Sequence, residues 1–225
     1  MRGVVYVLAK EPEPGRVKTR LCPPLTPQQA AELAEALLTD TVARLCAGAA
    51  WEVVLAVDPA GGGPILDALC VRFRLARVEQ GQGDLGNRMG GLMARGHGSG
   101  RPVLLVGADT PDLPIAYVAM AVDCLSREPV VLGPSRDGGY YLVGAGSPVP
   151  GLFDIDAAWS SAGVLAATVR RLEEQSIRPF LLPAWEDIDD AGALLRLSLR
   201  LRDGLAEAES TAELLERWAS RGVTF

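Results

Sequence analysis

The feature of this sequence that most constrains its fold is the alternation of short apolar runs with stretches of helical periodicity. Apolar runs rich in β-branched and aliphatic residues predict seven strands, at 4–9, 52–57, 73–78, 102–108, 129–133, 140–145 and 178–183. Helical patterns predict helices at 27–47, 63–70, 84–96, 114–126, 160–175, 190–203 and 211–220. Strands that alternate with helices are typical of an α/β fold with a mostly parallel central sheet.

One pair of strands breaks this alternation. The runs 129–133 and 140–145 follow each other too closely for a helix to lie between them, so one strand is expected to run antiparallel. No repeat or linker divides the chain, and its 225 residues suffice for one core, so we expect a single domain over 1–225. In such sheets ligands bind beyond the carboxyl ends of the strands.

Two helix starts carry a local capping signal. Thr26, followed by Pro27 and then by Gln29 at the third position, predicts a capping box at the first helix. Ser210 and Glu213 repeat the spacing before the last helix. The segment 205–225 is amphipathic, and we expect it either to cap the sheet or to pair two subunits in a homodimer.

Charge and composition exclude several classes of partner. A formal net charge of −6 leaves no basic face for duplex nucleic acid, and 5% aromatic residues give no stacking platform for single strands. No run approaches 18 apolar residues, and the first residues do not form a signal peptide, so we expect a cytoplasmic protein with no membrane partner. The four cysteines form no C-x-x-C pair and are expected to be reduced thiols.

The loop after the first strand, "KEPEPGRVKTRL", concentrates positive charge in an acidic chain. Arg16, Lys18 and Arg20 would point to one side of an extended segment, where they repel one another unless an anion lies between them. Two prolines and Gly15 favour a rigid loop whose backbone N–H groups converge, and Lys10 adds a fourth cation. The loop is therefore a candidate phosphate site, and the alternative is a solvated charged loop.

The segment after the third strand, "GQGDLGNRM", contains G-x-G-x-x-G. Gly81, Gly83 and Gly86 match the dinucleotide-binding fingerprint, but that fingerprint belongs to the first strand–helix turn of a sheet and not to the third. We therefore expect a loop that lets the backbone approach a base or ribose. Gln80 and Arg88 flank it and are further candidates for nucleotide binding.

Carboxylates follow the fourth and seventh predicted strands. Asp109, in "GADTPDLP", is a candidate ligand for Mg²⁺ (or Mn²⁺), since these ions prefer oxygen donors. Asp187 or Asp189, in "AWEDIDDAGALL", would supply a second ligand. The alternatives are a turn formed by Asp109 and helix capping by Asp189 or Asp190.

A glycine pair and an aromatic segment complete the candidate site. In "SRDGGYY" the glycines allow a substrate to approach the backbone beside a tyrosine, although a hairpin turn is the alternative. In "AAWSS" a serine could cap the next helix and the tryptophan could belong to the core. The candidate acceptor-binding residues are Asp137, Gly138, Gly139, Tyr140, Trp159 and Ser160.

Taken in order, six motifs resemble those of a bacterial family of GT-A-like transferases that is often labelled glycosyltransferase and associated with arsenosugar biosynthesis. They are "AKEPEPGRVKTRL", "GDLGNRM", "LLVGADTPDLP", "LGPSRDGGYYLVG", "AWSS" and "DIDDAGAL", and the resemblance spans Val4 to about Leu194. The segment "KTRLCPPLTPQQAAELAEALLTDTV" is also similar to the opening of 2-phospho-L-lactate guanylyltransferase. The resemblance implies a GT-A-like (nucleotide-diphospho-sugar transferase) three-layer fold in which the first loop holds nucleotide phosphates, Asp109 binds Mg²⁺, and the Asp187–Asp189 region assists.

From these residues and this resemblance, the leading hypothesis is a metal-dependent nucleotidyltransferase. It would move a nucleoside monophosphate from a nucleoside triphosphate to a phosphorylated or oxyanion small-molecule acceptor and release pyrophosphate. Arg16, Lys18 and Arg20 would hold the β- and γ-phosphates, and Asp109 would act with the metal. The alternatives are a glycosyltransferase that uses a nucleoside diphosphate sugar, and a nucleotide-binding module without catalytic activity.

Overall fold

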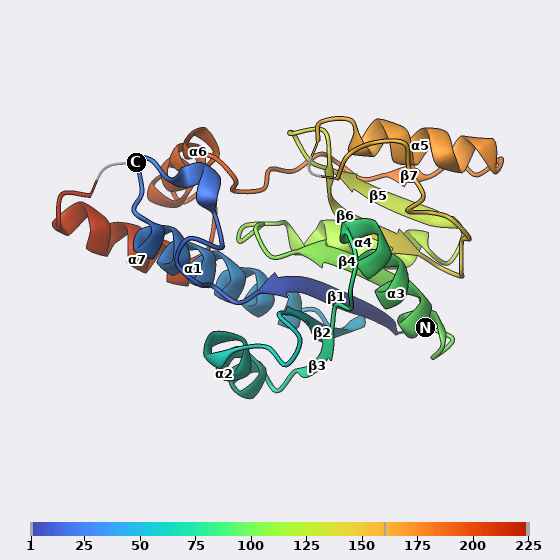
Figure 1. The fold of residues 1–225 in the computed structure, drawn as a ribbon, viewed down its shortest axis with the longest axis horizontal. Coiled ribbons are helices and arrows are strands. Elements are labelled where there is room, and N and C mark those ends of the chain that lie inside the picture. Colours follow the sequence, from blue (N-terminus) through green and yellow to red (C-terminus); the bar gives the residue numbers. More distant parts are fainter. Residues whose placement is uncertain (1, 160, 224–225) are drawn as a thin grey trace.

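The computed structural model describes residues 2–159 and 161–223 and contains a seven-stranded sheet in the order β3-β2-β1-β4-β6-β5-β7 (Figure 1). The strands are β1 (Gly3–Lys10), β2 (Trp51–Asp58), β3 (Ala76–Glu79), β4 (Val103–Gly107), β5 (Val130–Pro134), β6 (Tyr140–Ala145) and β7 (Phe180–Leu181). Strand β6 is antiparallel to both β4 and β5, and the other pairs are parallel. The predicted mostly parallel sheet with one antiparallel strand is confirmed.

The helices form a layer on each face of the sheet. They are α1 (Pro27–Cys46), α2 (Pro64–Phe73), α3 (Leu85–His97), α4 (Ile115–Cys124), α5 (Val164–Glu174), α6 (Ala191–Arg202) and α7 (Glu209–Ser220). One apolar core joins α1, α2 and α4 to the sheet, and a second joins α3 and α5 to its other face. Within the described residues, no helix is long and apolar enough to cross a membrane.

The central strand β1 shows why the core strands are apolar throughout. Val5 of β1 pairs with Val53 of β2 and with Leu104 of β4, and all three side chains are buried. Parallel strands covered by helices on both faces have no side that faces solvent, so their sequences are continuous apolar runs and do not alternate between apolar and polar residues. This is the pattern that made these strands recognisable.

A third core lies beyond the carboxyl ends of the parallel strands. There α6, α7 and the 3₁₀ turn Thr19–Leu21 pack against the first half of α1 (Figure 1). Trp218 and Leu214 of α7 belong to the same cluster as Leu33 and Leu37 of α1. The C-terminal helix therefore packs on α1, and the predicted alternative that it caps the sheet is wrong.

The helix starts show where local signals decide and where they do not. Thr26 and Gln29 form the predicted capping box, with Thr26 Oγ1 accepting from the Gln29 amide at 3.2 Å. At α7 the predicted cap by Ser210 is wrong. The carboxylate of Asp40, on α1, instead accepts from the backbone N–H groups of Ser210 and Thr211 at 2.9 and 2.8 Å.

Two predicted boundaries also move. The strand predicted from residue 73 begins at Ala76, because α2 continues to Phe73 and Arg74 then adopts a left-handed conformation with φ of 54°. The helix predicted from residue 160 begins at Val164, and its N-cap, Gly163, offers no side-chain hydrogen bond. The predicted cap by Ser161 is wrong, and Ser160 lies outside the described residues.

Candidate active site

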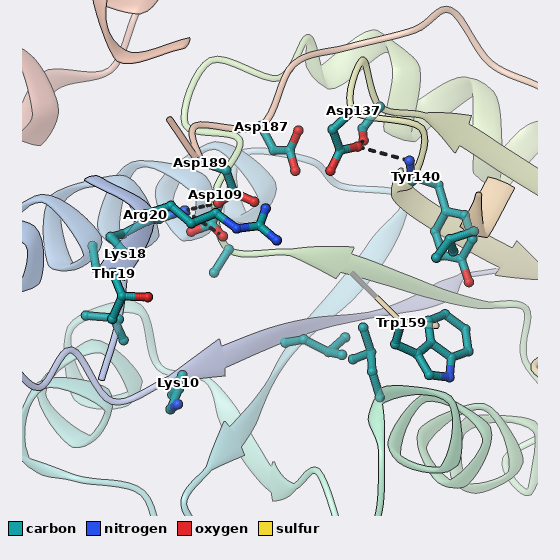
Figure 2. A pocket seen from close by; sticks show the side chains of 18 of the residues that line it. Lys10, Lys18, Thr19, Arg20, Asp109, Asp137, Tyr140, Trp159, Asp187 and Asp189 are labelled. Carbon is teal, nitrogen blue, oxygen red and sulfur yellow. Dashed lines mark hydrogen bonds and ion pairs between the residues drawn. The ribbon is translucent and has the colours of Figure 1, made fainter. Parts of the chain in front are cut away.

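A cleft of about 480 Å³ opens at the carboxyl edge of the parallel strands (Figure 2). Its lining comes from segments far apart in the sequence, including the basic loop (residues 10–20), the end of β4, the turn between β5 and β6, and the segment after β7. The members of the predicted site that line it are Lys10, Arg16, Lys18, Arg20, Asp109, Asp137, Gly139, Tyr140, Trp159, Asp187 and Asp189. Sequence reasoning missed Thr19, Leu85 and Ser135, which line it too.

The basic loop is fixed at its start by a buried carboxylate. Glu11 accepts hydrogen bonds from the backbone N–H groups of Ile65 and Leu66 at 3.1 and 3.2 Å, at the beginning of α2. Next, Gly15 has φ of 77°, which a glycine adopts without strain, and the Arg16 amide donates to the Glu13 carbonyl. The loop is therefore a folded turn and not an extended segment.

Lys18 takes a different course from its neighbours. Its backbone is left-handed, with φ of 47° and ψ of 35°, so the predicted alternation that would align it with Arg16 and Arg20 is wrong. Its ammonium lies 2.8 Å from Asp109 Oδ2 and 2.7 Å from Asp189 Oδ1, and only 6% of the side chain is exposed. Lys18 thus joins the basic loop to two of the predicted metal ligands.

Three other cations of the loop remain near the cleft. Arg16 is 60% exposed and pairs with Glu13 at 2.7 Å. Arg20 points into the cleft (Figure 2), and neither it nor Lys10 has an ion-pair partner within residues 2–159 and 161–223. These two side chains are therefore the ones available to an anionic ligand.

The sequence held a signal that pattern reading missed. The chain has 22 basic residues, of which only Lys10 and Lys18 are lysines, and both line the cleft. Arginine serves everywhere else. A lysine ammonium is a compact charge that can exchange partners, whereas a guanidinium binds in a fixed planar fork.

The carboxylates converge because of the strand order. Asp109 follows β4, and its carbonyl accepts from the Ile188 amide at 3.0 Å, which attaches the segment after β7 to the end of β4. The acidic group formed by Asp137, Asp187 and Asp189 places one carboxylate oxygen from each residue within 4.8 Å of the others. Asp137 was predicted to contact the acceptor, and the structure brings it to the predicted metal ligands.

Burial and mutual repulsion perturb this site. Burial, followed by the charges of Asp137 and Asp189, raises the pKa of Asp187 to about 6. For Lys18, burial by itself lowers the pKa, but the Asp109 and Asp189 carboxylates outweigh it and leave the pKa raised. Lys18 is therefore a permanent cation at neutral pH and not a nucleophilic amine.

Helix α6 holds the acidic segment in place through a second set of ion pairs. The buried Glu186 pairs with Arg196 at 2.8 Å, and the buried Asp112 pairs with Arg200 at 2.8 Å. Asp112 also accepts from Trp185 Nε1 at 3.2 Å. Glu186, next to Asp187, and Asp112, three residues after Asp109, are thus both tied to α6, which helps to fix the carboxylates beside them.

The aromatic end of the cleft rests on α3. A Cβ atom on Gly86 would lie 2.6 Å from the Trp159 ring, so this glycine lets the indole pack against the helix backbone. In the β5–β6 turn the Asp137 carboxylate accepts from the Gly139 amide at 3.0 Å, and Gly138 has φ of 91°. The predicted hairpin turn and the cleft lining are therefore the same feature.

Several predicted nucleotide contacts have structural partners. The Gln80 amide donates to two backbone carbonyls at the ends of β1 and β2, at 3.1 and 2.9 Å. Arg88 pairs with Asp58 at 3.0 Å and donates to the Gly83 carbonyl at 3.1 Å. None of the three predicted contacts Gln80, Gly83 and Arg88 is among the residues that line the cleft.

A second cavity, of about 880 Å³, lies between α3 and the segment 148–159. Met93, Phe153 and Trp159 contribute to its walls, and Trp159 also lines the first cleft. No lysine or arginine of the described chain lines this second cavity.

The sequence profile of one family, described as "Uncharacterized protein conserved in bacteria (DUF2064)", matches residues 41–161, which is more than half of the chain. The chain belongs to this family. The search of curated protein sequences found no match to this chain.

Solved structures agree on the fold of this family member. The chain is similar to a "putative nucleotide-diphospho-sugar transferase" from Desulfovibrio desulfuricans G20, with 29% identity, a TM-score of 0.86, and coverage of 98% of this chain and 96% of that one. A cytidylyltransferase from Leptospira borgpetersenii (14% identity, TM-score 0.60, coverage 99% and 96%) shares the fold. So does CMP:2-keto-3-deoxy-manno-octonic acid synthetase complexed with CTP (12% identity, TM-score 0.58, coverage 91% and 100%). The predicted transferase fold is confirmed.

Proposed function

We propose that this protein is a metal-dependent nucleotidyltransferase. It moves a nucleoside monophosphate from a nucleoside triphosphate to a phosphorylated or oxyanion small molecule and releases pyrophosphate. The observation that carries the proposal is the cleft itself, where Lys10 and Arg20, which have no ion-pair partner among the described residues, line the same space as four carboxylates from three other segments. The shared fold with the two cytidine-nucleotide enzymes named above supports the same class of reaction.

The side chains of the basic loop bind the leaving group. Arg20 and Lys10 have no ion-pair partner in the described chain and line the cleft, so the β- and γ-phosphates provide their counter-charge. Negative charge grows on the pyrophosphate as the bond to the α-phosphorus breaks. Preorganised cations at that position stabilise the transition state more than the bound triphosphate.

The donor set fits Mg²⁺ or Mn²⁺. Carboxylate oxygens are the preferred ligands of these ions, and Asp137, Asp187 and Asp189 bring three of them within 4.8 Å while Asp109 lies across Lys18. Asp109, Asp187 and Asp189 would hold the ion, as the sequence predicted, and Asp137 joins them. A bound ion supplies charge neutralisation at the reacting phosphate.

The acceptor lies at the aromatic end of the cleft. Tyr140 and Trp159 line this end, and Figure 2 places them on the side of the cleft away from Arg20 and Lys18. Their rings orient the acceptor and exclude water, which would otherwise compete for the α-phosphorus.

The main alternative is a glycosyltransferase that uses a nucleoside diphosphate sugar. It is favoured by the name of the structural neighbour at 29% identity. The cations would then hold the diphosphate leaving group, and the region around Tyr140 would hold the sugar. A nucleotide-binding module without turnover is the remaining alternative.

Calorimetric titration with the four nucleoside triphosphates and common nucleotide sugars, with and without Mg²⁺, tests the proposal. We expect Mg²⁺-dependent binding of one triphosphate that is lost in Asp109→Ala. Tighter binding of a nucleotide sugar, with release of nucleoside diphosphate on turnover, would establish the glycosyltransferase instead. Metal-independent binding that survives Asp109→Ala would support the non-catalytic module.

A further inference from the structure

We propose that the ammonium of Lys18 holds the place of the divalent cation between Asp109 and Asp189, and that metal binding requires this ammonium to leave. The inference deepens the proposed function and rests on its metal site. It assigns Lys18 the role of an exchangeable counterion, whose ammonium contacts phosphate oxygens only after a metal ion has displaced it from the carboxylates.

The contacts of Lys18 are those of a resident cation. Its ammonium lies 2.8 Å from Asp109 and 2.7 Å from Asp189 and has only 6% of its side chain exposed. The two carboxylates are 38% and 39% exposed, so they remain accessible from the cleft. An incoming ion therefore reaches the carboxylates directly, while the ammonium occupies the space between them.

Asp189 makes the two arrangements exclusive. It belongs to the acidic group with Asp137 and Asp187, and at the same time it accepts from Lys18. A divalent ion bound to Asp189 and Asp109 would lie against the ammonium, and two cations at contact distance repel strongly where solvent is scarce. Two of the carboxylates that would bind the metal, Asp109 and Asp189, are those that now bind Lys18.

The backbone at Lys18 allows the side chain to move alone. The Lys18 carbonyl accepts from the Leu21 amide at 2.9 Å and so anchors the residue at the start of the 3₁₀ turn. A lysine side chain has four rotatable carbon–carbon bonds beyond this anchor, so exchange requires rotamer changes and no rearrangement of the loop.

The exchange couples the metal to the nucleotide. With metal alone, the displaced ammonium loses two carboxylate partners and enters a cleft that already contains Arg20 and Lys10. With a triphosphate in the cleft, phosphate oxygens replace those partners. The metal and the triphosphate therefore assist each other's binding, and the assistance is reciprocal because it is a coupling free energy.

Binding of Mn²⁺ to the ligand-free protein, followed by electron paramagnetic resonance, tests the exchange. Lys18→Met keeps the length of the side chain and removes the charge, and we expect it to bind Mn²⁺ at least tenfold more tightly than the unaltered protein. Lys10→Met is the matched control, since it makes the same change to the other lysine of the cleft, whose ammonium has no ion-pair partner among the described residues. It should change the affinity by less than threefold.

The Mn²⁺ affinities of the two variants and of the unaltered protein distinguish the exchange from a general charge effect. Equal tightening in both variants would mean that only the net charge of the cleft matters, and it would overturn the exchange. Unchanged affinity in Lys18→Met would overturn it as well. If neither the unaltered protein nor either variant bound Mn²⁺, the metal dependence of the proposed function would be contradicted, and this inference would fail with it.

A second measurement needs no variant and remains valid if Lys18→Met does not fold. Brief acetylation with acetic anhydride, read by peptide mass spectrometry, gives the labelling ratio of Lys18 to Lys10 in one sample. We expect this ratio to rise at least threefold on addition of saturating Mg²⁺, relative to NaCl of equal ionic strength. A constant ratio, where calorimetry shows that Mg²⁺ binds, would overturn the proposal.

Discussion

The two cavities that meet at Trp159 differ in chemistry and in the way the fold builds them. The smaller one, of about 480 Å³, gathers both lysines of the chain together with Asp109 and the acidic group. The larger one, of about 880 Å³, has no lysine or arginine in its described lining. We therefore base the proposed active site on the convergence of opposite charges and not on the size of the cavity.

The difference follows from the positions of the cavities. The smaller cleft lies at the carboxyl edge of the sheet, where loops from β1, β4, β5 and β7 meet, so side chains distant in sequence converge there. The larger cavity runs along the side of α3, and most of the rest of its lining comes from the neighbouring segment 148–159.

The largest expected difference is between substitutions of one carboxylate from each cavity. Asp109→Asn removes a proposed metal ligand that also pairs with Lys18, and we expect kcat/KM to fall by about 10³-fold or more, as for loss of a preorganised charge. Asp154→Asn, in the lining of the second cavity, is the matched control and should stay within about twofold. Rates of pyrophosphate release measure both. Comparable losses in the two variants would contradict the contrast.

The two arginines of the basic loop should differ next. Arg20→Ala removes a cation directed into the cleft and should cost about 2–4 kcal/mol of transition-state stabilisation, as for other preorganised donors. Arg16→Ala removes an exposed cation already paired with Glu13 and should cost less than about 1 kcal/mol. Ratios of kcat/KM test the order, and a larger loss for Arg16 would reverse these roles.

The wall between the cavities can be tested with two glycines of α3. A Cβ on Gly86 would lie 2.6 Å from the Trp159 ring, so Gly86→Ala should destabilise the protein by about 1–3 kcal/mol through overpacking. Gly91→Ala, on the same helix, meets no atom within 4 Å and should stabilise it by about 0.5–1 kcal/mol. Urea unfolding measures both free energies. Equal effects of the two substitutions would show that Trp159 does not lie against the helix.

The smallest effect concerns pH. Because burial raises the pKa of Asp187 to about 6, its contribution to stability is fully present below about pH 4 and is lost as the pH rises through 6. In metal-free buffer, the free energy of unfolding of Asp187→Asn should therefore rise by about 1–2 kcal/mol relative to that of the unaltered protein between pH 4.5 and pH 7.5. This value is reduced by the solvent that reaches the half-buried carboxyl group. Urea unfolding at the two pH values with EDTA gives the difference. A pH-independent difference would place Asp187 in water.

The sequence predicted what depends on neighbouring residues. The sheet class, the antiparallel strand and the capping box at Thr26 all rest on patterns within a few positions, and all are confirmed. The convergence of Asp109 with Asp187 and Asp189 was also predictable, because the carboxyl ends of parallel strands share one edge.

What failed depends on contacts between distant residues. The cap of α7 comes from Asp40, some 170 positions away, so the serine at the helix start has no such role. The side-chain amide of Gln80 donates to backbone carbonyls of two strands, and no local sequence pattern indicates these contacts. The inward course of Lys18 follows from a left-handed backbone that a non-glycine residue adopts only when its surroundings impose it.

The attachment of α7 to α1 has a consequence for synthesis on the ribosome. Ala34 and Leu38 of α1 line the cleft, whereas Asp40, on the same helix, is buried and bonded to the start of α7. A nascent chain that has reached the acidic segment already contains every described residue of the cleft, yet this carboxylate still lacks its donors. The wall of the cleft thus gains this support only when α7 emerges from the exit tunnel.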